Sequence, residues 1–193
     1  MESRNANRAD GAEEFDQMSG KYLTFRLGNE EYGLEILRVR EIIGLMEITA
    51  VPGTPSSVRG VINLRGKVIP VQDLRLKFGM ERIQDSDQTC IIVAEIAKGG
   101  RSVENGILVD AVSEVLDIEA DDIEETPSFG SSVNTEFIQG MARTGDRVTI
   151  LLDVQNVVDK NEINDSSEAA GELNGGERED CIDKQEECLE NVV

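Results

Sequence analysis

Apolar and polar residues alternate over much of the chain between residues 20 and 159, and Gly, Asn and Pro mark the breaks. Alternation with a period near two residues is typical of β-strands that bury one face. The segments that follow it are residues 21–27, 32–37, 61–64, 67–74, 89–97, 105–112 and 147–154. Helical signals are short and weak, and they lie after Pro55, at residues 74–78 and at residues 154–164. The pattern therefore predicts a mainly β protein.

Residues 61–74 predict a β-hairpin. Two apolar runs flank the dipeptide Arg65-Gly66, and a glycine in such a short connection favours a tight reversal. Pro70 lies inside the second run and has no N–H to donate to a neighbouring strand. We therefore expect an edge strand or a β-bulge at this proline.

An internal repeat predicts the architecture. Residues 33–43 align without a gap on residues 106–116, and parts of residues 58–74 align on residues 138–154. Identical residue types coincide at Gly33/Gly106, Val39/Val112 and Glu41/Glu114. Each copy, around residues 33–78 and 106–158, is long enough for a five-stranded barrel, whose closure removes exposed sheet edges. We expect two small barrels built on one plan; the alternative is chance similarity between strands rich in Val and Ile.

The two ends of the chain differ in composition from the middle. Residues 1–19 carry a net charge of −3 and residues 160–193 a net charge of −8, out of −20 for the whole chain. Both ends have too little apolar surface to offset the entropy of ordering, so we expect disordered tails around a folded segment of residues 20–159. The acidic excess favours solubility over a dedicated binding tail. It also argues against nucleic-acid binding, which depends on neutralising phosphates.

The residue types present exclude several kinds of chemistry. The chain has no histidine, so catalysis by imidazole and histidine-ligated metal sites are excluded. Cys90, Cys181 and Cys188 fit neither a disulfide framework nor a closed four-ligand metal site, which indicates a reducing, intracellular compartment. The first twenty residues lack the pattern of a signal peptide, and no apolar run approaches the roughly 18 residues of a membrane span. We expect a cytoplasmic protein with no direct membrane insertion.

Three segments resemble binding or catalytic motifs only superficially. Residues 60–68 lack the glycine spacing of a phosphate-binding loop and the hydroxyl residue that follows its lysine. The acidic run at residues 121–125 lacks the glycine of a calcium loop, which favours a solvated turn. Cys90 begins an apolar run and is better interpreted as a small buried residue than as a nucleophile. We therefore expect no enzyme activity, cofactor or metal.

Arg59 and Arg65 lie at predicted turns of this acidic protein. The planar guanidinium group matches carboxylates, and arginine is enriched in protein interfaces. The alternative is an ion pair with a local carboxylate such as Asp73. Both arginines are therefore candidates for a protein-interface role.

Four spaced elements give the chain a specific resemblance to a known family. They are E-E-Y-G at residues 30–33, V-R-G-V-I-N-L-R-G at 58–66, P-V-x-D-L-R at 70–75 and G-I-L-V-D-x-V at 106–112. With the stretches around them, they resemble the CheW family of chemotaxis coupling proteins over residues 20–158. The acidic extension after Lys160 falls outside the resemblance, so its role stays open.

The resemblance implies a fold and a function. The fold is a pair of intertwined, five-stranded SH3-like barrels with short helices. The function is that of a non-enzymatic adaptor that joins the cytoplasmic tips of chemoreceptors to the regulatory domain of the CheA histidine kinase. Such an adaptor is expected to be monomeric alone and multimeric in receptor arrays associated with the membrane.

The resemblance also implies which residues contact partners. Arg65 and Gly66 are expected at or near the kinase and receptor contacts. The other positions matched to partner contacts are Val39, Glu41, Ile42, Gly106 and Val115. Each has a structural alternative, because the glycines serve backbone geometry and the valines belong to the core in a repeated strand pattern.

Two other functions stay open at this point. One is a small β-barrel that binds a ligand in its interior, which a cavity of roughly 300 Å³ or more with converging polar groups would favour. The other is a CheW-like adaptor that serves a chemosensory system other than swimming.

Overall fold

A computed structural model describes residues 17–127 and 135–159 of the chain. Residues 1–16 of the tail predicted at 1–19 and the whole tail predicted at 160–193, with Cys181 and Cys188, lie outside the described residues. The described residues all belong to one compact unit, Met1–Glu162. No helix in the described ranges is long and apolar enough to cross a membrane.

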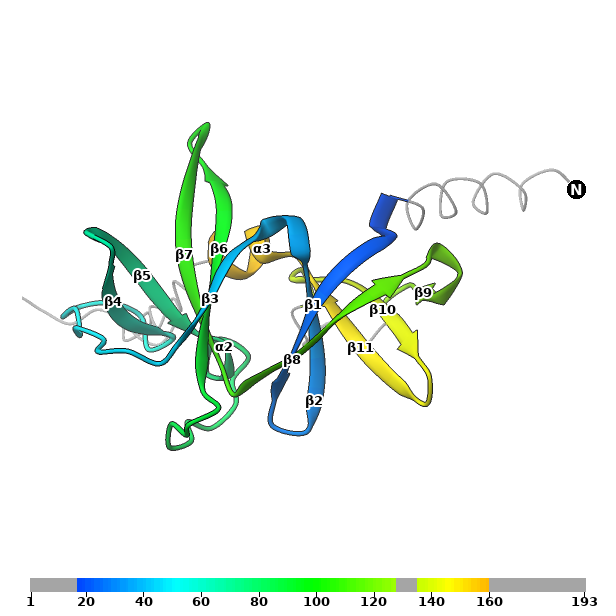
Figure 1. The fold of residues 1–193 in the computed structure, drawn as a ribbon, viewed down its shortest axis with the longest axis horizontal. Coiled ribbons are helices and arrows are strands. Elements are labelled where there is room, and N and C mark those ends of the chain that lie inside the picture. Colours follow the sequence, from blue (N-terminus) through cyan, green and yellow to red (C-terminus); the bar gives the residue numbers. More distant parts are fainter. Residues whose placement is uncertain (1–16, 128–134, 160–193) are drawn as a thin grey trace, which may run out of the picture. The chain divides into compact units, whose positions relative to one another are not determined.

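The described chain is mainly β, which confirms the predicted fold class, and its strands form two sheets (Figure 1). Sheet A has the strand order β8-β1-β2-β11-β10-β9 and sheet B the order β3-β6-β7-β5-β4. The strands of sheet A, in that order, are Ala111–Ile118, Gly20–Leu27, Glu30–Glu35, Arg147–Leu152, Ile138–Thr144 and Ile123–Glu124. Those of sheet B are Val39–Gly44, Cys90–Lys98, Arg101–Val109, Lys67–Asp73 and Val58–Leu64. The helices are η1 (Ile36–Arg38), α2 (Leu74–Lys77), η2 (Ala120–Asp122) and α3 (Val154–Asp159).

The two halves of the repeat exchange strands. The first copy contributes β3, β4 and β5 to sheet B, but its β2 lies in sheet A and pairs in parallel with β11. The second copy contributes β8 to β11 to sheet A, but its β7 lies in sheet B and pairs in parallel with β5. This exchange is the intertwining that the resemblance implied.

The register of the two parallel pairings agrees with the repeat alignment. Gly33 pairs with Leu151 in sheet A, and Gly106 pairs with Val71 in sheet B. A Cβ atom at Gly33 would lie 3.1 Å from a methyl carbon of Leu151, and one at Gly106 would lie 3.0 Å from a methyl carbon of Ile91. Glycine occupies both positions because the neighbouring side chains leave little room for a Cβ atom.

Neither strand order closes into a ring among the described residues, so the closure expected of the barrels is not found. In sheet B, β5 and β7 pair only from Val71 and Gly106 onward. The outer edge of β4 receives a single bridge, between Thr49 and Val61. The subdomains are therefore curved sheets with open sides.

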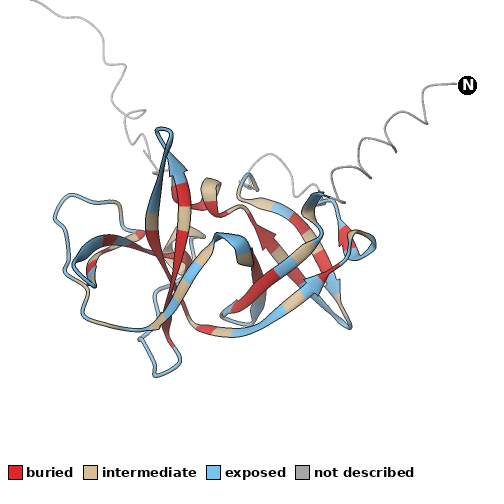
Figure 2. Cartoon of the chain, turned by 45° about the horizontal axis from the view of Figure 1, so that its top comes forward, coloured by how far each residue is buried: buried red, intermediate tan, exposed pale blue. Residues whose placement is uncertain are grey.

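Three clusters of buried side chains hold the fold together (Figure 2). The largest joins the two sheets, because it contains Phe25 and Leu34 of sheet A and Ile92 and Ile107 of sheet B. A row of four aromatic rings extends it, with centroids 5.8 Å apart for Phe25–Tyr32, 5.6 Å for Tyr32–Phe78 and 4.6 Å for Phe78–Phe137. Each of the two smaller clusters lies within one sheet, so the larger one carries the packing between them.

Several predicted elements differ in the structure. The chain after Pro55 turns and enters β4 at Val58, so the helix expected there is wrong. Pro70 lies in an interior strand rather than an edge strand, since β5 has β4 on one side and β7 on the other. The proline is tolerated because β5 does not pair with β7 until Val71, so no donor is needed at position 70.

The sequence analysis did not predict β3, β8 and β10 as separate strands. Their side chains are mostly half-buried or exposed, so no run of apolar residues marks them. Met18, which the sequence placed in the N-terminal tail, packs against the sheet A cluster. Its carbonyl accepts a hydrogen bond from the Tyr22 hydroxyl at 2.7 Å.

Both copies of the repeat end with an aspartate that caps a short helix. Asp73 Oδ1 accepts from the backbone N–H groups of Arg75 and Leu76, at 3.0 and 3.3 Å. Asp153 Oδ1 accepts from those of Gln155 and Asn156, at 2.8 and 3.4 Å. The two sites differ because Asp73 also forms a part-buried ion pair with Arg59.

The capping aspartates provide a matched test of that ion pair. Asp73→Ala should lower the free energy of unfolding by about 2–4 kcal/mol, because it removes a cap and one of the two carboxylate partners of a part-buried guanidinium. Asp153→Ala removes a cap and the hydrogen bond that Asn156 Nδ2 donates to Asp153 Oδ2 at 2.8 Å, and it should cost about 1–2 kcal/mol. Urea unfolding followed by circular dichroism measures both values. Equal losses would show that the ion pair with Arg59 adds no stability.

Candidate functional site

The β4–β5 hairpin turns through Arg65 and Gly66, which confirms the predicted tight reversal. Their φ angles are 52° and 87°, as in the two-residue hairpin turn that needs positive φ at both central positions. The Gly66 N–H donates to Asn63 Oδ1 at 2.9 Å. Arg65 is the one residue other than glycine with positive φ in the described ranges, so an unfavourable backbone conformation coincides with a candidate interface residue.

Arg65 and Glu41 form an ion pair, which brings together two residues that the sequence singled out separately. Arg65 Nη2 lies 2.8 Å from Glu41 Oε2, and Nη1 lies 3.4 Å from Oε1. The arginine side chain is 79% exposed and the glutamate side chain 26% exposed. A surface pair of this kind stabilises a fold by about 1 kcal/mol or less. Its main effect is to orient a guanidinium group that still faces solvent.

The remaining candidates on β3 do not share one surface with Glu41. Glu41 and Ile42 are adjacent in a strand, so their side chains point to opposite faces. Ile42 is 45% exposed, whereas Val39 is half-buried and packs against the cluster that joins the sheets. Val39 therefore fits its structural alternative, and Ile42 remains available to a partner.

Val115 lies on β8 of sheet A and is 48% exposed. Its pairing partner in the sheet is Leu23, whose side chain is buried. Exposure of nearly half of this valine argues against the core alternative for it. The candidate residues thus fall on both sheets, with Arg65, Glu41 and Ile42 on sheet B and Val115 on sheet A.

The two candidate glycines have different environments. A Cβ atom at Gly66 would meet no atom within 4 Å, so its positive φ is the reason for glycine there. Gly106 is buried, and a Cβ atom would lie 3.1 Å from Val71 as well as close to Ile91. The burial of Gly106 fits its structural alternative, a position without room for a Cβ atom, and its part in a partner contact stays a prediction.

Arg59 takes the local alternative rather than an interface role. Its side chain is 11% exposed, and its nitrogens lie 3.1 Å from Asp73 Oδ2 and 2.8 Å from Asp85 Oδ2. Burial acts to lower the pKa of Arg59, but the hydrogen bonds and charges of Asp85 and Asp73 outweigh it and raise the pKa. A guanidinium group held in this way is withdrawn from solvent, so we leave Arg59 out of the proposed interface.

Exposed apolar residues are surface features that the sequence did not reveal. Leu37 in η1 is 81% exposed, although the sequence placed it in a strand. Val68 and Val148 are also exposed, and they occupy equivalent positions after the two hairpin turns. The local pattern of apolar and polar residues does not distinguish such exposed residues from core residues. The repeat alignment does show that Val68 and Val148 occupy equivalent positions in the two copies.

The described residues offer no arrangement for metal or thiol chemistry. No group of three or more Asp, Glu or Cys side chains within them is placed to hold a metal ion. Cys90 is buried as predicted, and its burial raises the pKa of the thiol. The exposed candidate residues among those described are therefore surface positions on the two sheets, and no metal cluster lies beside them.

Comparison with known proteins agrees with a two-subdomain β scaffold. The CheW-like domain family matches residues 21–162, so the chain belongs to the CheW family, as its sequence motifs indicated. The chemotaxis protein CheW of Klebsiella aerogenes is 40% identical over 143 residues, covering 74% of this chain and 84% of that protein. A probable chemotaxis protein CheW of Rhizobium etli is 35% identical over 155 residues, covering 80% of this chain and 95% of that protein.

A solved structure supports the same assignment. The scaffolding protein TtCheW from Thermoanaerobacter tengcongensis superposes with a TM-score of 0.65 at 38% sequence identity. The match covers 75% of this chain and 95% of that one. The chain is thus similar to a scaffold protein in both sequence and fold.

The turn at Arg65 predicts that a substitution which removes the charge of this side chain stabilises the fold. Arg65→Asn should raise the free energy of unfolding by about 0.5–1 kcal/mol, because asparagine tolerates positive φ and Asn-Gly is the preferred pair for this turn. Thermal unfolding of the variant and the parent chain measures the difference. A lower melting temperature for Arg65→Asn would show that the ion pair with Glu41 outweighs the backbone cost.

Proposed function

We propose that the chain is a non-catalytic adaptor that links the cytoplasmic tips of chemoreceptors to a CheA-type histidine kinase. Membership of the CheW family supports the adaptor role. The Arg65–Glu41 ion pair is the observation that connects this role with particular residues. It holds an exposed guanidinium group in a defined orientation at the tip of a hairpin. Arginine presented in this way suits recognition of a carboxylate on a partner.

The two sheets supply two separate surfaces for the two partners. In this proposal the hairpin of Arg65 on sheet B faces the kinase, and the surface around Val115 on sheet A faces the receptor. The cluster that joins the sheets fixes these surfaces on one packed core, because it contains residues of both. A shift in receptor geometry can then alter the geometry of the bound kinase without any reaction in the adaptor.

Weak individual contacts are sufficient for such an adaptor. Micromolar binding corresponds to about −8 kcal/mol, and repetition of the contacts in an array raises the effective concentration of every partner. Contacts of this strength leave the adaptor monomeric in solution, and their repetition in a receptor array holds many copies together. Its place is the cytoplasmic side of the membrane, where it is held by receptors rather than by insertion.

The structure gives no support to a ligand bound inside a barrel. Buried side chains of Ile62, Val71, Ile91 and Leu108 pack together on the inner face of sheet B. A cleft larger than the expected threshold does exist, with a volume of about 910 Å³, but it opens between two strands at the side of sheet B. It is therefore a surface site, distinct from a barrel interior.

A charge swap tests the role of Arg65. Arg65→Glu should lower kinase activation at least about tenfold in vesicles that contain receptor and a CheA-type kinase, because it reverses the charge offered to the kinase. The double variant Arg65→Glu, Glu41→Arg restores the ion pair but not the charge at position 65, so activation should stay low. Arg143→Glu, in an exposed pair with Glu124 on β10 and β9, serves as the matched control and should keep full activation. Recovery in the double variant would show that Arg65 acts only through Glu41.

Substitution of Val115 tests the second surface. Val115→Asp should weaken co-sedimentation with receptor-bearing membranes about tenfold, since it places a charge in an apolar contact. Binding to the isolated kinase should be unchanged, and the half-exposed position should keep the loss of stability small. Retained co-sedimentation would remove Val115 from the receptor surface.

A further inference from the structure

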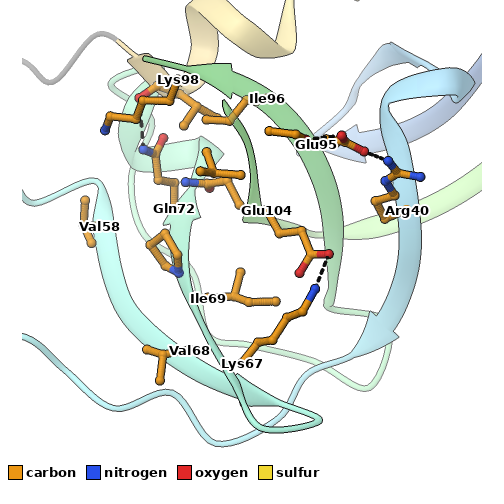
Figure 3. A pocket seen from close by; sticks show the side chains of 15 residues that line it. Arg40, Val58, Lys67, Val68, Ile69, Gln72, Glu95, Ile96, Lys98 and Glu104 are labelled. Atoms are coloured by element: carbon orange, nitrogen blue, oxygen red, sulfur yellow. Dashed lines mark hydrogen bonds and ion pairs between the residues drawn. The ribbon is translucent and has the colours of Figure 1, made fainter. Parts of the chain in front are cut away.

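A cleft lies in sheet B where two parallel strands diverge. The pairing of β5 with β7 covers only Val71 to Asp73 against Gly106 to Leu108. The residues before this contact separate, and residues 67–70 and 102–105 line a cleft of about 910 Å³ (Figure 3). None of the residues assigned to the kinase and receptor surfaces lines it.

Two buried amide oxygens in the lining have no hydrogen-bond partner. They are Gln72 Oε1 and Asn105 Oδ1, on residues that are 6% and 5% exposed. Gln72 Nε2 donates to the Val158 carbonyl at 3.3 Å, which fixes the orientation of that amide. A buried acceptor without a donor costs about 1–3 kcal/mol. Because neither oxygen has an exposed surface, the two atoms lower the stability of the cleft wall, and a ligand must be held by other groups.

The walls of the cleft are strand edges. β5 pairs with β4 on its other side from Lys67 to Gln72, and β7 pairs with β6 along Arg101 to Val109. On the sides that face each other, residues 67–70 and 101–105 have no strand partner. Unpaired strand edges bind extended peptides through backbone hydrogen bonds, with pockets for alternate side chains.

The charges and apolar groups of the lining define the peptide further. Lys67 pairs with Glu104 at 3.0 Å, and Arg40 pairs with Glu95 (Figure 3). Lys98, which also lines the cleft, takes part in none of the ion pairs recorded among the described residues. Apolar lining comes from Val58, Val68, Ile69, Ile96 and Val103. The lining suits a segment with apolar side chains and a carboxylate.

We propose that this cleft binds an extended peptide segment of another protein, whose backbone pairs with the open edges of β5 and β7 and whose carboxylate pairs with Lys98. The strand edges favour a peptide over a small molecule, because a small molecule would leave most of them unpaired. The site gives the adaptor a third contact, lined by none of the residues proposed for the kinase and receptor surfaces.

Selection from a defined peptide pool tests the site. The probe is a pool of hexapeptides with alternating Val, Ile, Thr and Ser and a free terminal carboxylate, presented to the immobilised full-length chain. Retained peptides are then measured singly by isothermal titration calorimetry, with expected dissociation constants in the range of about 1–100 μM. N-methylation of the backbone should weaken binding about tenfold or more, because it removes donors. Amidation of the terminus should weaken it several-fold.

Variants of the protein separate this site from a structural role. Val103→Asp should weaken binding about tenfold with little loss of stability, because it places a charge in the apolar lining at a position that is 36% exposed. Lys98→Ala should weaken binding of the carboxylate form only, whereas Lys21→Ala on sheet A should have no effect. Failure to retain any hexapeptide, or binding unaffected by Val103→Asp and by N-methylation, would overturn the proposal. Equally tight binding of N-acetylated single amino acids would overturn the assignment to a peptide.

Discussion

The fold depends on a close parallel contact that the chain makes twice. Gly33 lies against Leu151 in sheet A and Gly106 against Val71 in sheet B, and in each case one copy of the repeat lends a strand to the other. Both contacts need a glycine because a Cβ atom would lie within about 3.1 Å of a neighbouring side chain. Each sheet is therefore completed by a strand of the other copy.

Polar contacts reinforce the junction that this exchange creates. Arg75, which follows β5, pairs with Asp110 at 2.5 Å, between β7 and β8. Asp110 also accepts a hydrogen bond from the Gly28 N–H at 2.7 Å, in the turn between β1 and β2. One carboxylate thus ties together elements of both sheets. A junction held by packing and by charge gives the two proposed partner surfaces a common support.

The two arginines near β4 illustrate how exposure separates structure from function. Arg59 is enclosed by Asp73 and Asp85 and stabilises the end of β5, where a buried guanidinium group requires paired charges. Arg65 has one carboxylate partner and stays in solvent, in a backbone conformation that costs stability. The chain retains this arrangement at a position where the charge is available to another protein. The amide oxygens without partners at the β5–β7 cleft also lower the stability of the fold, as the backbone conformation of Arg65 does.

The sequence by itself determined the mainly β class, the tight hairpin, the buried Cys90 and the repeat, because each depends on residues close in the chain or on similarity between two segments. The family motifs added the intertwined pair of subdomains and the candidate contact residues. Only the tertiary structure decided that Arg65 meets Glu41, that Arg59 is paired with two carboxylates while Gly106 is buried, and that β5 and β7 diverge into a cleft. These features depend on contacts between residues remote in sequence, and exposure is a property of such contacts. A local pattern of apolar and polar residues therefore cannot distinguish an exposed arginine or valine from an enclosed one.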